Sequence, residues 1–138
     1  MFAKRIAAVV LMAASTLSAV AVAAPTEAPS ANCILAKHRV TQVQPLHVSE
    51  RYGRGTVERL AGARVFVQAE PGLTAEWLQL TLQRHLASMN GSMANCPLDA
   101  KDVQVKVVSA GPGFSVQITG KNAAQGQEIL RRAQLLVR

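Results

Sequence analysis

His85 and Met89 come nearest to a ligand set by residue type and spacing. They stand four positions apart in a segment with helical periodicity, so they share one helix face about one turn apart. Met93 follows the helix-stopping pair Asn90-Gly91 and would fold back toward them. Imidazole with thioether sulfur suits a soft ion, Cu(I) or Ag(I). The trio predicts a soft-metal site. The alternative is a core-facing stripe with methionine as filler.

Other metal or catalytic constellations are weaker. His38 and His47 would complete a three-histidine site only if the strands bring them near His85, and no pair of histidines has zinc-ligand spacing. Asp99 and Asp102, three apart beside a lysine, suit a solvated loop better than a carboxylate pair. No G-x-S-x-G turn or phosphate-binding loop occurs. We therefore expect a non-enzymatic protein with no cofactor, Cu(I) at the trio excepted.

A second group of residues is cationic and crowds one predicted hairpin. Guanidinium groups recognise phosphate and carboxylate, so arginines on one side of a hairpin would bind an anionic surface: lipid head groups, cell-wall polymers or an acidic protein. The alternative is a solvated face in which Glu50 and Glu58 are local partners. Nucleic acid is not expected as a partner, because aromatic residues make up only 4% of the chain. The arginines are Arg51, Arg54, Arg59 and Arg64.

The chain has two cysteines, Cys33 and Cys96, and they do not form a C-x-x-C redox motif. In an oxidising compartment a single Cys33–Cys96 disulfide is the preferred interpretation, and closing so long a loop would stabilise the fold by about 4 kcal/mol. Two separate reactive thiols or metal ligands are the alternative.

The N-terminal segment has the parts of a secretory signal peptide. Lys4 and Arg5 precede an apolar stretch that ends in Ala21-Val22-Ala23, an A-x-A cleavage pattern. We predict a cleavable signal peptide at 1–24, a flexible tether of Pro, Ser and Ala at 25–32, and one domain at 33–138; a retained anchor is the alternative. Losing the leader, which carries two basic and no acidic residues, lowers the formal charge from +7 to +5.

The signal peptide predicts a periplasmic or secreted protein with no membrane span after cleavage. Its partner would then be another periplasmic or envelope protein. The leading functional hypothesis is a non-enzymatic binding or accessory module.

The hydrophobic pattern predicts that the domain which positions these residues is α+β. Alternating apolar residues predict strands near 40–48, 56–60 and 64–68, with turns at 51–55 and 61–63. Thr74 caps a predicted helix to Met89, residues 103–107 and 114–119 form a hairpin, and Asn122 begins a last helix. We expect a small single domain with an antiparallel or mixed sheet of about 4–5 strands and two helices on one face, in the order β-β-β-α-β-β-α. From Arg64 onward the order β-α-β-β-α resembles most of a ferredoxin-like unit.

Overall fold

The computed structural model describes residues 28–29, 31–89 and 93–138. The predicted leader, much of the tether and the Asn90-Gly91 helix stop lie outside the described residues. The fold is α+β, as the sequence predicted. Its elements are the 3₁₀ helix η1 (Ile34–Lys37), β1 (Val40–Tyr52), β2 (Gly55–Gln68), α1 (Ala75–Ser88), β3 (Gln104–Ala110), β4 (Gly113–Thr119) and α2 (Ala123–Gln134).

The four strands form one sheet in the order β1-β2-β4-β3, and every neighbouring pair is antiparallel. β4 lies between β2 and β3, so β2–α1–β3 is a split crossover, as in a ferredoxin-like unit. β1 comes first in the chain and occupies the outer position beside β2. A parallel bridge from Val137 to Val40 ties the last turn of the chain to the start of β1.

The predicted turn at 61–63 is wrong, because β2 runs through it as one strand. Gly62 pairs with Leu46 on one side and Thr119 on the other. A β-carbon at Gly62 would collide with the backbone carbonyl of Ile118, so this glycine permits a close approach of two strands. The register slips beside it, between Leu46 and His47, which is a bulge in the β1–β2 ladder.

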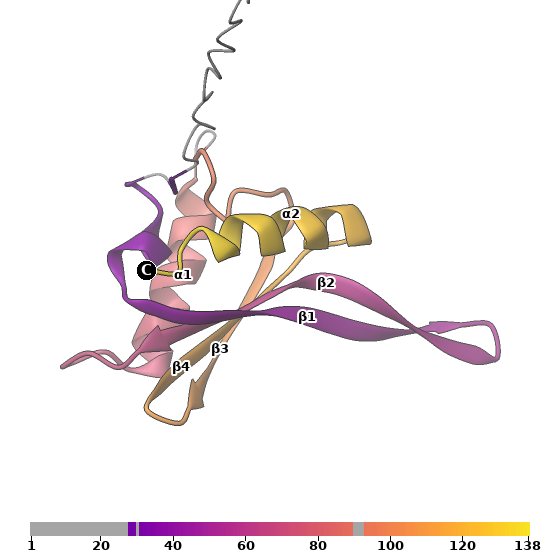
Figure 1. Cartoon of the computed structure of the whole chain (residues 1–138), viewed down its shortest axis with the longest axis horizontal. Coiled ribbons are helices and arrows are strands. Elements are labelled where there is room, and N and C mark those ends of the chain that lie inside the picture. The colour runs from indigo at the N-terminus through magenta and orange to yellow at the C-terminus, as the bar shows by residue number, and fades with distance from the viewer. Residues whose placement is uncertain (1–27, 30, 90–92) are drawn as a thin grey trace, which may run out of the picture.

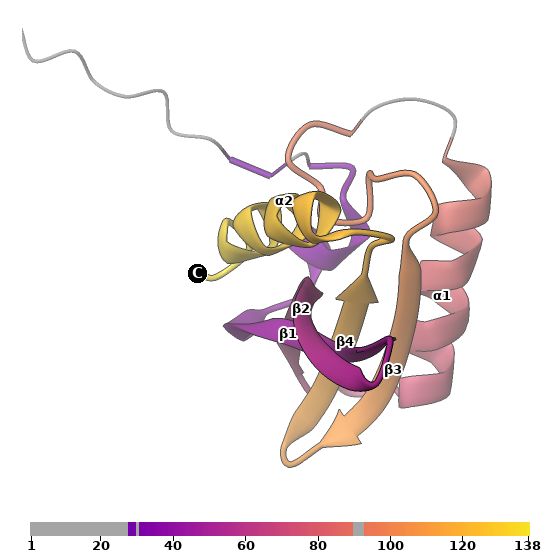
Figure 2. The same cartoon turned by 90° about the vertical axis from the view of Figure 1, so that its right-hand side faces the viewer.

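Both helices contribute to one core on a single face of the sheet. α1 lies alongside β3 and α2 above β2 (Figures 1 and 2). Each helix has the cap that its sequence predicted: the Thr74 side chain accepts from the backbone N–H of Trp77, and that of Asn122 from Gln125. The core cluster includes Val65 and Val67 of β2, Val116 and Ile118 of β4, Leu78 and Leu82 of α1, and Ile129 and Ala133 of α2.

The outer edge of β3 is closed by a side chain of α1. The side-chain oxygen of Gln79 accepts from the backbone N–H of Val107 at 2.6 Å, and its nitrogen donates to the Val105 carbonyl at 2.9 Å. Gln79 thus occupies backbone groups that an edge strand would otherwise offer to another chain.

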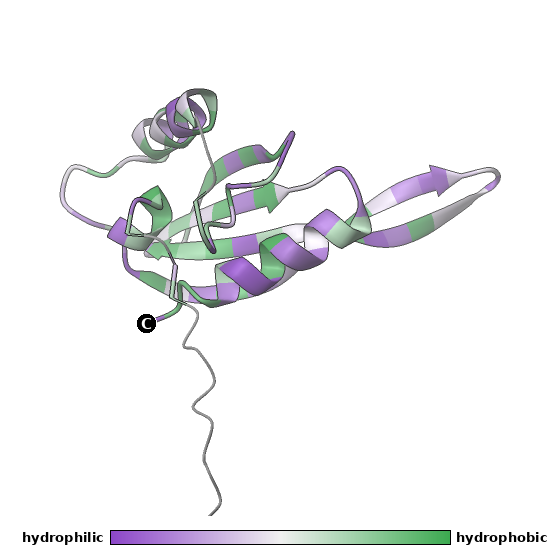
Figure 3. Ribbon diagram, turned by 90° about the horizontal axis from the view of Figure 1, so that it is seen from above, coloured by the Kyte–Doolittle hydropathy of each residue, from purple (hydrophilic) through white to green (hydrophobic). Residues whose placement is uncertain are grey.

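The distal half of the β1–β2 hairpin leaves the sheet. β2 pairs with β4 only from Gly62 to Gln68, so residues 55–60 pair with β1 alone. We call residues 47–60 the arm. Figure 1 shows it extending past the end of α2, and Figure 3 shows hydrophilic and hydrophobic residues interspersed along it. A two-residue turn with Gly53 at φ +60° closes its tip.

Gly126 permits α2 to approach β2, and its substitution tests this packing. A methyl group there would lie 2.5 Å from the Leu60 carbonyl oxygen and 2.8 Å from the Ala61 carbonyl carbon. Alanine normally stabilises a helix by about 1 kcal/mol relative to glycine. Gly126→Ala should instead lower the unfolding free energy by about 1–3 kcal/mol, measured by urea denaturation. Gln127→Ala, on the exposed side of α2, should leave it within about 0.5 kcal/mol. A Gly126→Ala variant as stable as the native protein would contradict this packing.

Candidate functional site

The predicted Cys33–Cys96 disulfide is present, and both cysteines are fully buried. Their Cα atoms are 5.5 Å apart across a sequence separation of 63 residues. In the chain-entropy estimate a loop of that length stabilises the fold by about 4 kcal/mol. The bond joins the segment before η1 to the loop after α1.

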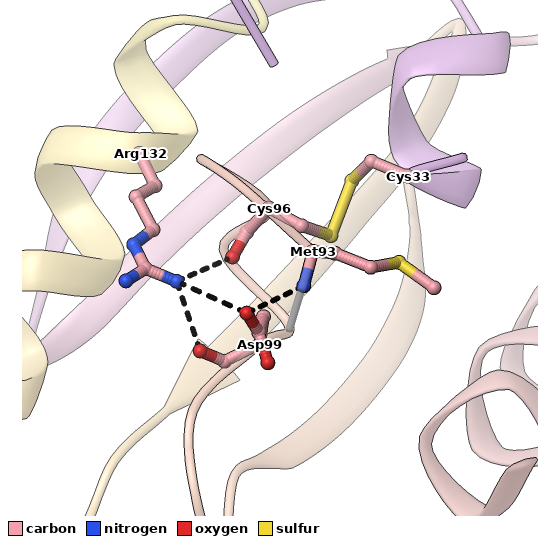
Figure 4. Close-up of a disulfide and its surroundings, with 5 residues drawn as sticks. All are labelled: Cys33, Met93, Cys96, Asp99 and Arg132. Carbon is pink, nitrogen blue, oxygen red and sulfur yellow. Dashed lines mark hydrogen bonds and ion pairs between the residues drawn. A yellow bond between two sulfur atoms is a disulfide. The ribbon is translucent and has the colours of Figure 1, made fainter. Parts of the chain in front are cut away.

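Arg132 of α2 holds the same loop from the other side (Figure 4). Its Nη1 donates to the carbonyl oxygens of Cys96 and Asp99 at 3.2 and 2.9 Å, and the Asp99 carboxylate accepts from the Met93 backbone N–H at 2.7 Å. Asp102 instead pairs with Lys121 at 2.6 Å, and the hydrogen bond from Lys121 lowers the pKa of its carboxyl. The two aspartates that the sequence placed three apart therefore have separate partners.

The predicted metal ligands lie at the end of α1 (His85 and Met89) and in the loop that carries Cys96 (Met93). His85 is half-buried on α1, and Nε2 of its ring is buried with no hydrogen-bond partner in the described part of the chain. Burial, and then the nearby charge of Lys37, lower the pKa of this imidazole. Met89 and Met93 pack against the core, and Met93 stands on the same loop as Cys96 (Figure 4).

The other two histidines do not join His85. His38 faces Glu70 with 3.5 Å between Nδ1 and Oε2, and His47 is exposed on β1 opposite Leu60. Over the described ranges, no group of three or more His, Cys, Asp or Glu side chains is placed to hold a metal ion.

The hairpin arginines are divided by the strand register. Arg51 pairs with Thr56 and Arg59 with Val48, positions that alternate to opposite faces of the arm. Arg59 binds Glu50 through Nη2 at 2.6 Å. Arg54 lies in the tip turn, and Arg64 lies beyond the bulge within the sheet proper, opposite Gln117 of β4. The structure thus leaves Arg51 and Arg54 together near the tip and sets the other two apart.

The arm tip also exposes apolar side chains. Tyr52 is 82% exposed and Val57 56% exposed. A cleft of about 500 Å³ lies between them and Ala123, at the start of α2. We call Arg51, Tyr52, Arg54 and Val57 the arm tip. The sequence analysis identified Arg51 and Arg54 but not that they stand outside the sheet, because hairpin length alone does not reveal where the neighbouring strand stops.

Sequence reasoning also missed a cleft of about 740 Å³ on the sheet face opposite the helices. Side chains of Gln42 and Phe66 and the β3–β4 turn at Pro112 line it. The alternation in β2 and β4 contained the signal: Phe66 and Ser115 fall out of phase with the core valines and pair across the strands.

Comparison with models of protein families, with curated proteins and with solved structures gives no match. No helix within the described ranges is long and apolar enough to span a membrane.

Glu128 of α2 makes the unfolding free energy depend on pH in the acid range. Hydrogen bonds from Arg131 and then from Arg132 lower the pKa of its carboxyl to about 2. In the unfolded chain this carboxyl takes up its proton near pH 4.5. The stabilisation is therefore complete above that pH and disappears as the pH falls toward 2.

Glu128→Gln should lower the unfolding free energy by about 1 kcal/mol at neutral pH, a modest amount because the side chain is 41% exposed. Denaturation curves across the acid range should show the two proteins converging as the carboxyl protonates. Glu58→Gln, which removes an exposed arm carboxylate, should change stability little. A gap between wild type and Glu128→Gln that persists at the acid end would contradict the assignment.

Proposed function

We propose that this protein is an exported, non-enzymatic binding module that attaches to anionic surfaces of the cell envelope through its arm tip. One observation carries the proposal: an aromatic ring, an aliphatic side chain and two arginines are exposed at the end of a two-stranded arm outside the sheet, with Tyr52 and Val57 on one face of the arm and Arg51 on the other. None of these four side chains is buried in the core. The export part of the proposal is supported by the buried disulfide, which is typical of oxidising compartments.

The tip chemistry suits the interface between water and an anionic bilayer. Tyrosine is enriched at that boundary because its ring is apolar and its hydroxyl is polar. Each arginine near an anionic surface contributes about 1 kcal/mol, and this contribution weakens with salt. Arg51 and Arg54 have no ion-pair partner in the described part of the chain, so their charges are available to head groups.

Vesicle co-sedimentation tests the arm tip directly. The protein should bind vesicles of phosphatidylglycerol and phosphatidylcholine but not pure phosphatidylcholine, and raising salt about tenfold should release it. The double variant Arg51→Gln, Arg54→Gln should bind about tenfold more weakly. Tyr52→Ser should also weaken binding.

Matched controls remove the same groups elsewhere. Arg84→Gln with Lys101→Gln makes the same change in net charge, and Trp77→Ser removes an aromatic side chain that is 51% exposed on α1. Both controls should bind like wild type. Equal losses in tip and control variants, or binding that does not respond to salt, would refute the arm-tip assignment.

Soft-metal binding is a second candidate function, and one observation favours it. Nε2 of His85 is buried without a hydrogen-bond partner among the described residues, and burial lowers the pKa of the ring, which favours the neutral imidazole that binds metals. Met89 would be the next ligand, and Met93 the third.

Titration with Cu(I) against a competing chelator tests this candidate. One equivalent should bind, and the double variant His85→Ala, Met89→Ala should weaken binding at least about tenfold. His47→Ala, which removes the exposed histidine of the arm, is the control and should change nothing. An affinity unaffected by the double variant would eliminate the site.

A further inference from the structure

The sheet face opposite the helices has its own chemistry. We call it the open face, because both helices pack on the other side. Strand register places its side chains in rows that cross all four strands. One row reads Gln44, Arg64, Gln117, Lys106, and the next reads Gln42, Phe66, Ser115, Val108.

Two polar groups at the centre of this face lack partners. Arg64 is half-buried and its Nε is fully buried, yet it has no hydrogen bond and no ion pair among the described residues. Ser115, on the adjacent strand, is 3% exposed, and its hydroxyl has no partner either. Buried polar groups are normally hydrogen-bonded, and an arginine is rarely buried without an acid. Leaving Arg64 and Ser115 without partners costs stability, which is typical of side chains that bind a ligand.

Both charged residues in the first row, Arg64 and Lys106, are basic. Arg64 on β2 and Lys106 on β3 are separated by β4, which sets their backbones about 10 Å apart. Lys106 is exposed and has no acidic partner within the described chain. Gln44 and Gln117 complete the row, and each offers both a donor and an acceptor. Two cations flanked by amides are complementary to carboxylates carried on a backbone that itself has N–H and C=O groups.

The cleft of about 740 Å³ lies beside this row, toward the β3–β4 turn. Phe66 belongs both to the cleft and to the row that contains Ser115. With Pro112 it provides an apolar wall, and Gln42 and Gln68 provide polar groups. The cleft is large enough for an aromatic or aliphatic side chain adjoining an acidic group.

We propose that the open face binds an acidic peptide segment of a partner protein, with carboxylates on Arg64 and Lys106 and an apolar side chain in the Phe66 cleft. An acidic peptide combines carboxylates, backbone amides and an apolar group within so short a span. A single-stranded nucleic acid would need several stacking aromatics, and this face has one phenylalanine ring. A bilayer would meet a protruding tip more readily than a sheet face. This site is separate from the arm tip and does not rest on that proposal.

The test uses the purified protein with its disulfide intact and one defined probe. The probe is a terminally blocked decapeptide made of two copies of glutamate–glycine–glutamate–phenylalanine–glutamate. Calorimetric titration should give a dissociation constant below about 1 mM, and the same peptide with glutamine in place of glutamate should bind at least about tenfold more weakly. Amide resonances of the rows on β2, β4 and β3 should shift on binding.

The variants separate this site from the arm. Arg64→Gln with Lys106→Gln should weaken peptide binding at least about tenfold and leave vesicle binding unchanged. Arg51→Gln with Arg54→Gln makes the same change in charge and should do the reverse. Lys106→Gln alone, at an exposed position, keeps the test valid if the double variant unfolds, and it should weaken the peptide several-fold.

Three results would overturn the proposal. One is equal binding of the glutamate and glutamine peptides, and another is resonance shifts confined to the arm. The third comes from a competition assay with a fluorescently labelled copy of the glutamate peptide. If anionic vesicles or oligothymidylate displace that copy at a lower concentration than the unlabelled peptide does, the face would be assigned to lipid or nucleic acid.

Discussion

A buried disulfide fastens the two least regular segments of this domain to each other. Cys33 precedes η1, and Cys96 lies in the loop between α1 and β3. Neither segment has a ladder or a helix long enough to hold it, so the covalent bond and the Arg132 hydrogen bonds do that work. Through them the loop is fixed against α2, and α2 in turn lies on β2. The loop thereby ties the start of the domain to α2, while α1 is held by its buried Leu78 and Leu82 in the shared core.

That arrangement leaves a sheet with one covered face and one uncovered face. The two edges of the sheet are covered to different extents. Gln79 closes the outer edge of β3, and Val137 pairs with the start of β1. The remaining edge groups of β1 lie partly before the arm, where Pro45 has no N–H to donate, and partly in the arm with the distal part of β2. Surfaces available to a partner are therefore concentrated on the open face and the arm.

Sequence periodicity predicted the helices and the β3–β4 hairpin well because each buries a single face, and burial imposes its period on the residues. Gly62 was misread because glycine serves equally at a turn and where two strands approach closely. The arginines illustrate a different limit. Whether Arg51 and Arg59 share a face depends on pairing register and on a bulge, which are properties of two strands together and not of either sequence alone. Arg64 belongs with Lys106 for the same reason, although they are far apart in the chain.

β2 belongs at once to the arm and to the middle of the sheet, and this gives the domain a mechanical property. Any pull along the arm reaches β2 between β1 and β4, parallel to the strands and perpendicular to the ladder hydrogen bonds. The ladder is then loaded in shear, so its rungs resist together instead of opening one after another. A tip tethered to a surface would transmit tension along β2, past the bulge beside Gly62, and into the β2–β4 ladder.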